Sequence, residues 1–328
     1  MSEKEKLLKV NNLKMHFKVG ESIFGKKTYL KAVDGVNFDI NNSETFGLIG
    51  ESGCGKSTVA RTIMRLYKPT DGQIIFQGEN IDSLIEKDMR PFRKDIQMIF
   101  QDPYASLNPR MTIRQIIEEP MNVHKMSKGL EREDRIAEVL KSVGLNTGHL
   151  NRYPHEFSGG QRQRIGIARA LALNPKLVVC DEPVSALDVS IQSQILNLLR
   201  SLQQKLDLTF IFIAHDLSVV KHVSDKVIVM YLGKIVEIAK EEDLYSNSLH
   251  PYTKALLSAI PDPNPLKKKK RIILKGDVPS PSNPPRGCSF HTRCPYAQKI
   301  CSIEEPVLDE YENEHFASCH FVNKLEEL

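Results

Sequence analysis

The sequence lacks any apolar run long enough to cross a membrane as a helix. Such a helix needs about 20 mostly apolar residues, whereas the longest apolar runs here, Phe210–Ala214 and Val227–Leu232, have the length of strands. Met1–Lys9 is charged and has no apolar segment, so we expect no secretory signal there. If the protein serves a membrane process, other subunits must supply the spanning segments.

An excess of charge of one sign is also missing. The chain has 328 residues, 45 of them basic and 41 acidic, for a net charge of +4. Nucleic-acid-binding domains usually concentrate basic charge on one face, so the composition does not indicate a dedicated nucleic-acid binder. The length suffices for a large α/β domain and an appendage.

Strand and helix patterns alternate along most of the chain. Strand-like runs occur at Leu7–Val10, Leu30–Val36, Thr45–Ile49, Ile74–Phe76, Leu177–Cys180, Phe210–Ala214 and Val227–Tyr231. Helices are expected at Thr58–Tyr67, Ile113–Glu119, Arg132–Val143 (ended by Gly144) and Gln192–Gln204. The alternation predicts a mostly parallel sheet covered by helices, and the helical stretch at about 102–173 predicts an inserted subdomain.

The composition changes beyond about residue 250. Seven prolines between 261 and 285 flank the basic run Lys267–Arg271, as is typical of an extended connector. We therefore divide the chain into a nucleotide-binding domain at 1–250 and a C-terminal extension at 251–328. The basic run is expected to be solvated, and contact with anionic lipid is the alternative.

The run from Gly50 to Ser57 matches the phosphate-loop pattern G-x-x-x-x-G-K-[ST]. Its glycines let backbone N–H groups turn toward phosphate oxygens, and the following helix presents its positive end to the same anion. Lys56 adds a charge for the β- and γ-phosphates, and the Ser57 hydroxyl can bind Mg²⁺. The predicted ATP-binding residues of this segment are Gly50, Glu51, Ser52, Gly53, Cys54, Gly55, Lys56, Ser57 and Thr58.

Two carboxylates follow the apolar run Leu177–Cys180. Ligands of open α/β sheets bind at the carboxyl ends of the strands. We therefore expect Asp181 to hold Mg²⁺ and Glu182 to accept a proton from the attacking water. Without the phosphate loop, the same pattern would indicate only a strand followed by a capped helix.

The segment Phe157–Gln161 combines a helix cap with two glycines. Ser158 and Gln161 have the spacing of a capping box. Gly159 and Gly160 are costly at a helix start, and they are explained if backbone N–H groups must approach an anion. The helix continues with positive charge at Arg162, Arg164 and Arg169.

With these motifs in place, the chain resembles the nucleotide-binding subunit of an ATP-binding cassette (ABC) transporter over roughly residues 7–240. Phe157–Gln161 resembles the family signature, with Phe where Leu is commonest. Gln101 resembles the glutamine-loop residue that touches Mg²⁺ and the attacking water. Ser185-Ala186-Leu187-Asp188 resembles the loop that communicates between two such domains, and His215 resembles the switch histidine that contacts the γ-phosphate.

The resemblance implies a P-loop NTPase core with a mostly parallel sheet, an antiparallel β subdomain, an inserted helical subdomain and a cysteine-rich C-terminal extension. It implies catalytic roles for Glu182, His215 and Gln101, with Mg²⁺ held through Ser57, Gln101 and Asp181. It also implies a head-to-tail pair of domains, in which Ser158, Gly159, Gly160 and Gln161 act on the partner's ATP. An aromatic residue should stack on adenine, with Phe17 preferred and Tyr29 as the alternative.

The C-terminal part resembles that of oligopeptide and dipeptide importer ATPases, and the segments that carry this resemblance are Gly276–Pro281 and Gly287–Pro295. Two earlier segments, Gln101–Pro109 and Leu30–Val36, resemble the same subfamily, closest to its F-type subunit. This implies a paralogous ATPase as heterodimer partner, two permease subunits and an extracellular peptide-binding protein. It places the chain at the cytoplasmic face of the cell membrane. Nickel or another small solute is an alternative cargo. A soluble cassette ATPase not coupled to transport and a nucleotide-binding subunit that does not hydrolyse are alternative functions.

Four of the six cysteines, Cys288, Cys294, Cys301 and Cys319, lie in the extension. Disulfides are disfavoured in the cytosol, so a cluster there points first to metal. The spacings lack the short C-x-x-C pairs of ordinary zinc sites, whereas four thiolates suit an iron–sulfur cluster. The resemblance favours a [4Fe–4S] cluster, and reduced thiols without metal or a zinc site are the alternatives.

Overall fold

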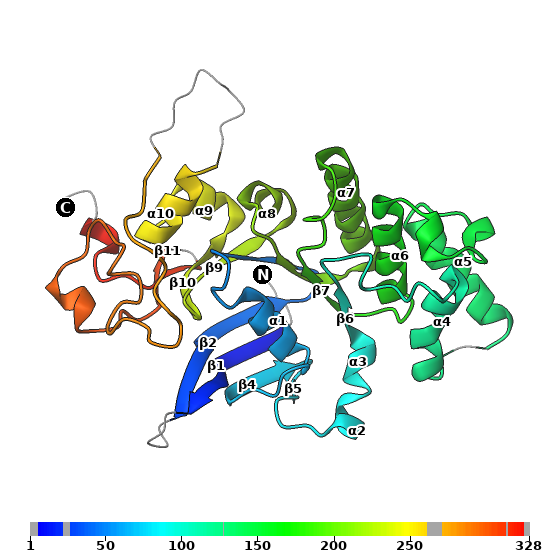
Figure 1. Ribbon diagram of the computed structural model, residues 1–328, viewed down its shortest axis with the longest axis horizontal. Coiled ribbons are helices and arrows are strands. Elements are labelled where there is room, and N and C mark those ends of the chain that lie inside the picture. The colour runs from blue at the N-terminus through cyan, green and yellow to red at the C-terminus, as the bar shows by residue number, and fades with distance from the viewer. Residues whose placement is uncertain (1–5, 22–26, 127, 261–270, 313, 325–328) are drawn as a thin grey trace. The chain divides into compact units, whose positions relative to one another are not determined.

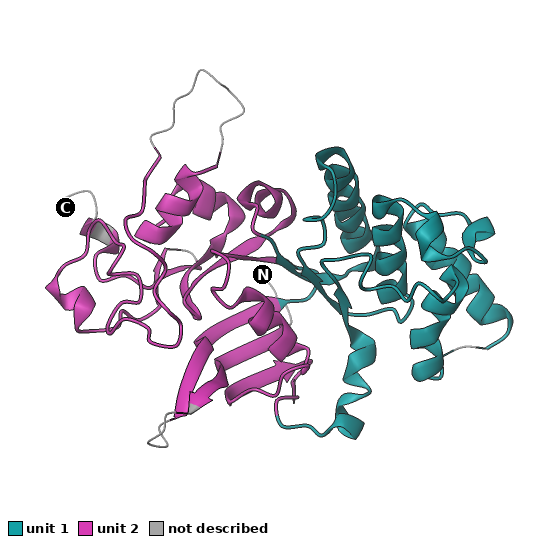
Figure 2. Cartoon of the chain, in the orientation of Figure 1, with its two compact units in different colours: residues 1–5, 41–45, 83–214 teal, residues 6–40, 46–82, 215–328 magenta. Residues whose placement is uncertain are grey.

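The computed structural model describes residues 6–21, 27–126, 128–260, 271–312 and 314–324. Two compact units emerge, coloured separately in Figure 2. Unit 1 comprises residues 1–5, 41–45 and 83–214, and unit 2 comprises residues 6–40, 46–82 and 215–328. The predicted boundary at residue 250 stays a prediction.

An antiparallel sheet in unit 2 has the strand order β2-β1-β4-β5. Its strands are β1 (Lys6–Glu21), β2 (Lys27–Asn41), β4 (Asp71–Phe76) and β5 (Glu79–Asn80). The first two are longer than their apolar runs predicted. The pairs Lys14–Asp71 and His16–Asp34, each 2.9 Å apart, lie beyond the apolar run that predicted β1, so hydropathy alone ends these strands too early.

A second group of strands in unit 2 carries the phosphate loop. Strand β3 (Thr45–Ile49) is parallel to β9 (Lys226–Tyr231), which forms an antiparallel hairpin with β10 (Lys234–Lys240). The helices of this unit are α1 (Lys56–Ile63), α8 (Leu217–Val223), α9 (Glu241–Ser246) and α10 (Pro251–Ser258). Helix α1 ends before the predicted Tyr67, because Arg65 has a left-handed backbone with φ of 56°.

Unit 1 contains three parallel, buried strands and most of the helices. The strands are β6 (Ile96–Ile99), β7 (Leu177–Asp181) and β8 (Thr209–Ile213). The helices are α2 (Glu86–Met89), α3 (Phe92–Asp95), α4 (Ile113–Val123), α5 (Leu130–Ser142), α6 (Gly159–Leu171) and α7 (Val189–Leu206), with 3₁₀ turns η1 (Thr147–His149) and η2 (Pro154–Glu156). Helices α4, α5 and α6 pack together, drawn in green shades in Figure 1, within the stretch expected to be helical.

The C-terminal extension contributes strands that the sequence did not reveal. Strand β12 (His315–Ala317) pairs antiparallel with β10 and with β11 (Asp309–Glu312). The extension also contains the short 3₁₀ turns η3 (Lys299–Ser302) and η4 (Val322–Lys324). Residues 271–287 form neither helix nor strand. Most of the basic run, 267–270, lies outside the described residues.

A buried carboxylate joins the extension to the rest of unit 2. Glu237 on β10 has no exposed surface and accepts hydrogen bonds from the backbone N–H groups of Leu249 and His250. Its Oε1 also lies 2.7 Å from Nε2 of His315 on β12. Buried charge is tolerated only when it is paired in this way. No helix in the described ranges is long and apolar enough to span a membrane.

Candidate active site

The phosphate loop connects β3 to α1 within unit 2. Gly50 has φ of 147°, and a Cβ there would lie 2.3 Å from the carbonyl oxygen of Met230, so this position admits only glycine. Lys56 is 6% exposed, and its Nζ donates to the carbonyl oxygens of Gly50 at 2.7 Å and Glu51 at 3.0 Å. These two hydrogen bonds join the end of the loop to its start.

The start of α1 is left open to an anion. Gly55 is its N-cap, and no side chain of the described residues caps the helix. The first N–H groups of a helix have no partner within the helix, and together with the helix dipole they bind phosphate. The loop therefore fits the triphosphate of a nucleotide.

Two residues that the resemblance marks as catalytic, Gln101 and Glu182, contact each other in unit 1. Nε2 of Gln101 donates to Oε2 of Glu182 at 2.8 Å. Glu182 follows the buried Asp181 at the end of β7 and has a left-handed backbone with φ of 48°. Its N–H donates to the carbonyl oxygen of Ile213 on β8 at 3.0 Å, which holds this unfavourable backbone in place.

The signature segment caps its own helix. Ser158 Oγ accepts from the N–H of Gln161, and the Gln161 side chain accepts from the N–H of Ser158, so the predicted capping box is confirmed. A Cβ at Gly160 would lie only 2.5 Å from Cγ2 of Ile191 on α7. Packing therefore accounts for Gly160 without an anion.

Three arginines that the sequence marked as positive charge on α6 bind backbone carbonyls. Arg162 donates to Pro154, Arg164 to Val143 and Arg169 to Ser106. These bonds tie α6 to the segments before it. The arginines therefore support the fold of unit 1.

The expected inter-subunit loop Ser185–Asp188 continues the turn after Glu182. Ser185 Oγ donates to the carbonyl oxygen of Glu182 at 3.1 Å. The Gln192 side chain donates to the carbonyl oxygen of Leu187 at 3.0 Å. Asp188 is the N-cap of α7, so the loop is tied to Glu182 at one end and to a helix at the other.

The remaining predicted residues lie in unit 2. His215 is exposed, just before Asp216, whose side chain caps α8. Phe17 lies within β1 and packs edge-on against Tyr67, with ring centroids 5.3 Å apart. Tyr29 on β2 is 44% exposed. The choice between Phe17 and Tyr29 for adenine stays a prediction.

Sequence reasoning missed two residues that hold the phosphate loop. The Tyr252 hydroxyl on α10 accepts a hydrogen bond from the N–H of Glu51, and the Arg293 guanidinium pairs with the Glu51 carboxylate. Both lie more than 200 residues from Glu51 in sequence. No local sequence pattern predicts contacts between residues so far apart.

The four cysteines of the extension are free thiols. Burial, with a smaller contribution from neighbouring thiols, raises the pKa of Cys288 to about 11 and that of Cys294 to about 12. In the part of the chain that the structure describes, no group of three or more His, Cys, Asp or Glu side chains is placed to hold a metal ion. The expected iron–sulfur cluster therefore finds no support in ligand geometry.

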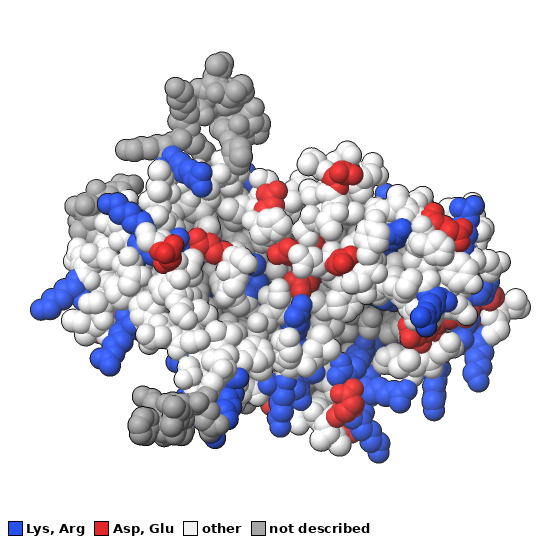
Figure 3. Space-filling view, in the orientation of Figure 1, with Lys and Arg blue, Asp and Glu red and all other residues white. Residues whose placement is uncertain are grey.

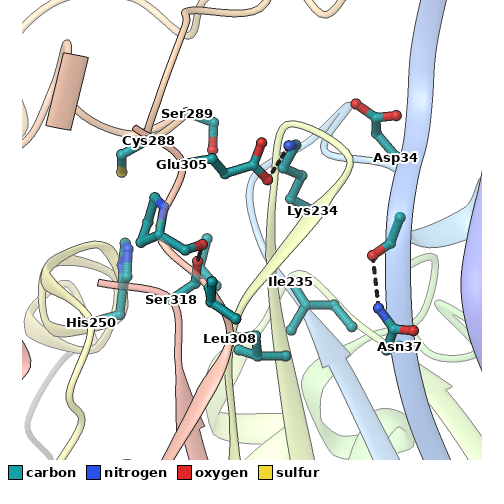
Figure 4. Close-up of a pocket in the computed structure, with 14 residues that line it drawn as sticks. Asp34, Asn37, Lys234, Ile235, His250, Cys288, Ser289, Glu305, Leu308 and Ser318 are labelled. Carbon is teal, nitrogen blue, oxygen red and sulfur yellow. Dashed lines mark hydrogen bonds and ion pairs between the residues drawn. The ribbon is translucent and has the colours of Figure 1, made fainter. Parts of the chain in front are cut away.

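A cavity of about 470 Å³ in unit 2 is lined by the extension and by β2 and β10 (Figure 4). Lys234 pairs with Glu305 across it, and Ser318 Oγ donates to the carbonyl oxygen of Pro306. Cys288 and the buried His250 lie on another part of its wall. None of the predicted nucleotide-binding residues lines this cavity.

A glycine-bounded phosphate loop, parallel strands ending in an Asp-Glu pair and a self-capped signature helix together define an ATP-binding cassette ATPase. The chain belongs to the ABC transporter family. The family profile described as "ABC transporter" matches residues 33–185, and the one described as "Oligopeptide/dipeptide transporter, C-terminal region" matches residues 236–301.

The relatives extend over nearly the whole chain. The oligopeptide transport ATP-binding protein AppF of Bacillus subtilis is 55% identical, over 97% of this chain and 98% of its own. The oligopeptide transport ATP-binding protein OppF of Salmonella typhimurium is 53% identical, over 99% of both chains. A dimeric ATP-binding cassette bound to ADP and Pi is 32% identical, with a TM-score of 0.63 over 71% of this chain and 98% of its own.

Proposed function

We propose that this chain is the ATP-hydrolysing subunit of an importer that takes up oligopeptides or dipeptides. The observation that carries this is the combination of a cassette fold with an extension of the oligopeptide/dipeptide type, matched over residues 236–301. The names of the near-full-length relatives support the same cargo.

The described residues suggest how each part contributes. The loop N–H groups and Lys56 bind the phosphates. Ser57, Asp181 and Gln101 would hold Mg²⁺, which would neutralise charge on the β- and γ-phosphates. Glu182 accepts the proton of the attacking water, and its hydrogen bond from Gln101 orients the carboxylate. His215 contacts the γ-phosphate in this proposal.

The self-capped α6 start supports a composite site. Ser158, Gly159, Gly160 and Gln161 would complete the ATP site of a paralogous ATPase, and that ATPase would complete the site of this chain. Two permeases and an extracellular peptide-binding protein would complete the importer, with this chain at the cytoplasmic face of the membrane. Binding closes the pair, and hydrolysis reopens it.

The face drawn in Figure 3 carries both basic and acidic side chains, with the basic ones more frequent along its lower edge. A nucleic-acid-binding cassette would favour one sign of charge on a face. The preference for coupling to a transporter therefore rests on the matched extension and the relatives, not on surface charge.

Reconstitution tests the cargo. The chain is co-expressed with its permeases and paralogue, purified as a complex and placed in vesicles with the binding protein. We expect peptide to stimulate ATP hydrolysis and to accumulate inside. Stimulation by nickel and not by peptide would support the alternative cargo, and failure to associate with any permease would contradict the proposal.

An iron–sulfur cluster on Cys288, Cys294, Cys301 and Cys319 is a separate proposal. Its support is the number of cysteines in the extension, since four thiolates suit such a cluster, and not their placement. Iron and sulfide analysis of anaerobically purified protein tests it, and folded protein without metal would contradict it.

A further inference from the structure

The phosphate loop contains a carboxylate that the extension neutralises. Nη1 of Arg293 donates to Oε2 of Glu51 at 2.7 Å, and Nη2 donates to Oε1 at 3.2 Å. The Arg293 side chain is 8% exposed and that of Glu51 is 28% exposed. Two parallel bonds between a guanidinium and a carboxylate fix direction as well as distance, so the pair orients the first turn of the loop.

A second contact holds the same residue through its backbone. The N–H of Glu51 donates to the hydroxyl of Tyr252 at 2.8 Å. The Tyr252 ring packs against those of Tyr231 and Phe290, with centroids 4.8 and 5.3 Å away. Phe290 belongs to the extension and is 1% exposed. The loop therefore rests on an aromatic cluster to which the extension contributes a ring.

Backbone hydrogen bonds within the extension fix the position of Arg293. The N–H of Arg293 donates to the carbonyl oxygen of Phe290 at 3.0 Å, and that of Cys288 donates to the carbonyl oxygen of Cys301 at 2.8 Å. Hydrogen bonds with Glu51 and with Tyr231 raise the pKa of Arg293. The guanidinium is therefore held by the Glu51 carboxylate and by Tyr231, a ring of the same aromatic cluster.

We propose that Arg293 is a positioning residue for ATP binding, through which the extension sets the affinity of the phosphate loop. An unpaired Glu51 carboxylate would place a negative charge in a loop that binds a triphosphate. Arg293 cancels that charge and holds the loop's first turn. The inference rests on the nucleotide site of the proposed function, and it adds a dependence of that site on the extension.

The test measures ATP affinity of the full chain by calorimetry, with KM and kcat for the wild type and Arg293→Gln. Removing the guanidinium leaves Glu51 unpaired near the phosphates, and charges near a protein surface interact at an effective dielectric of about 20, so we expect ATP to bind roughly tenfold more weakly. KM should rise by a similar factor, while kcat changes little.

The double variant Glu51→Gln/Arg293→Gln separates charge from structure. Removing both charges should restore affinity to within about threefold of the wild type, because no carboxylate is left to repel ATP. Arg286 is exposed and lies in the same extension, so Arg286→Gln is the matched control and should bind ATP like the wild type.

Two results would overturn the proposal. The first is that Arg293→Gln binds ATP with wild-type affinity. The second is that the double variant binds ATP as weakly as Arg293→Gln. If Arg293→Gln does not fold, Arg293→Lys keeps the charge and loses the paired geometry. It should bind ATP about threefold more weakly, and wild-type affinity in it would contradict a role for the paired geometry. A wild-type chain that binds no ATP would instead refute the proposed function.

Discussion

Two glycine-containing helix starts in this chain are built differently. At α1, no described side chain caps the helix, and Lys56 closes the loop before it. At α6, the side chains of Ser158 and Gln161 each accept a hydrogen bond from the other residue's backbone N–H. The close contact with Ile191 explains why residue 160 is a glycine. The first start is prepared for an anion within its own chain. The second is capped by its own side chains, and its action on a partner's nucleotide stays a prediction.

Replacing the loop lysine should have the largest effect. Lys56→Ala removes the charge that we propose contacts the phosphates and the bonds that close the loop, so we expect turnover to fall by about 1,000-fold. Steady-state ATPase assays of the assembled transporter measure it. Lys68→Ala, at an exposed position, is the control. Comparable activity in the two variants would contradict a special role for the loop.

The loop also rests on α10, which begins beside a buried histidine. Burial lowers the pKa of His250 to about 4, although the nearby Glu237 carboxylate opposes this. The unfolded state has a pKa near 6.5 and takes up the proton first, so the contribution of neutral His250 to stability is fully present above pH 6.5. It should fall by about 3 kcal/mol between pH 6.5 and 4.

Denaturant titrations across this pH range measure that fall. His250→Asn keeps a side-chain cap for α10 and removes the titrating group. Its stability should depend less on pH in this window. An identical pH dependence in both proteins would show that His250 is not the group responsible.

A methyl group at Gly160 should test whether packing explains the second helix start. Gly160→Ala would push against Ile191, and overpacking costs about 1–3 kcal/mol. Gly166 lies in the same helix, and a Cβ there would meet nothing within 4 Å. Gly166→Ala should therefore stabilise by roughly 0.5–1 kcal/mol. Thermal unfolding measures both changes, and a change of the same sign in the two variants would contradict the packing account.

The smallest effect is expected at the cap of α6. Ser158→Ala removes the bond to the N–H of Gln161, which should cost about 1 kcal/mol of stability. Ser158→Thr retains an acceptor oxygen and should lose little. Equal stability of Ser158→Ala and the wild type would show that this helix start does not depend on its own cap.

Local motifs made much of the site predictable. The strand Thr45–Ile49, the loop after it and the capping box at Ser158 each depend on neighbours in sequence, and the structure has them as expected. The Gln101–Glu182 bond joins residues far apart, and resemblance to the family indicated that they act together.

Long-range contacts could not be predicted in this way. Strand β12 has three residues and exists because β10 offers an edge. No sequence pattern around Arg293 predicts that it pairs with Glu51. The cysteines of the extension suggested a metal centre by their number, whereas their placement depends on packing that hydropathy does not encode.

The central claim is that this chain hydrolyses ATP with Glu182 as the base. Glu182→Gln keeps the shape of the side chain and removes its basicity, so ATP binding should match the wild type. Turnover by the assembled transporter should fall at least about 100-fold. If the variant still turned over ATP at the wild-type rate, the assignment of Glu182, and the site built around it, would be wrong.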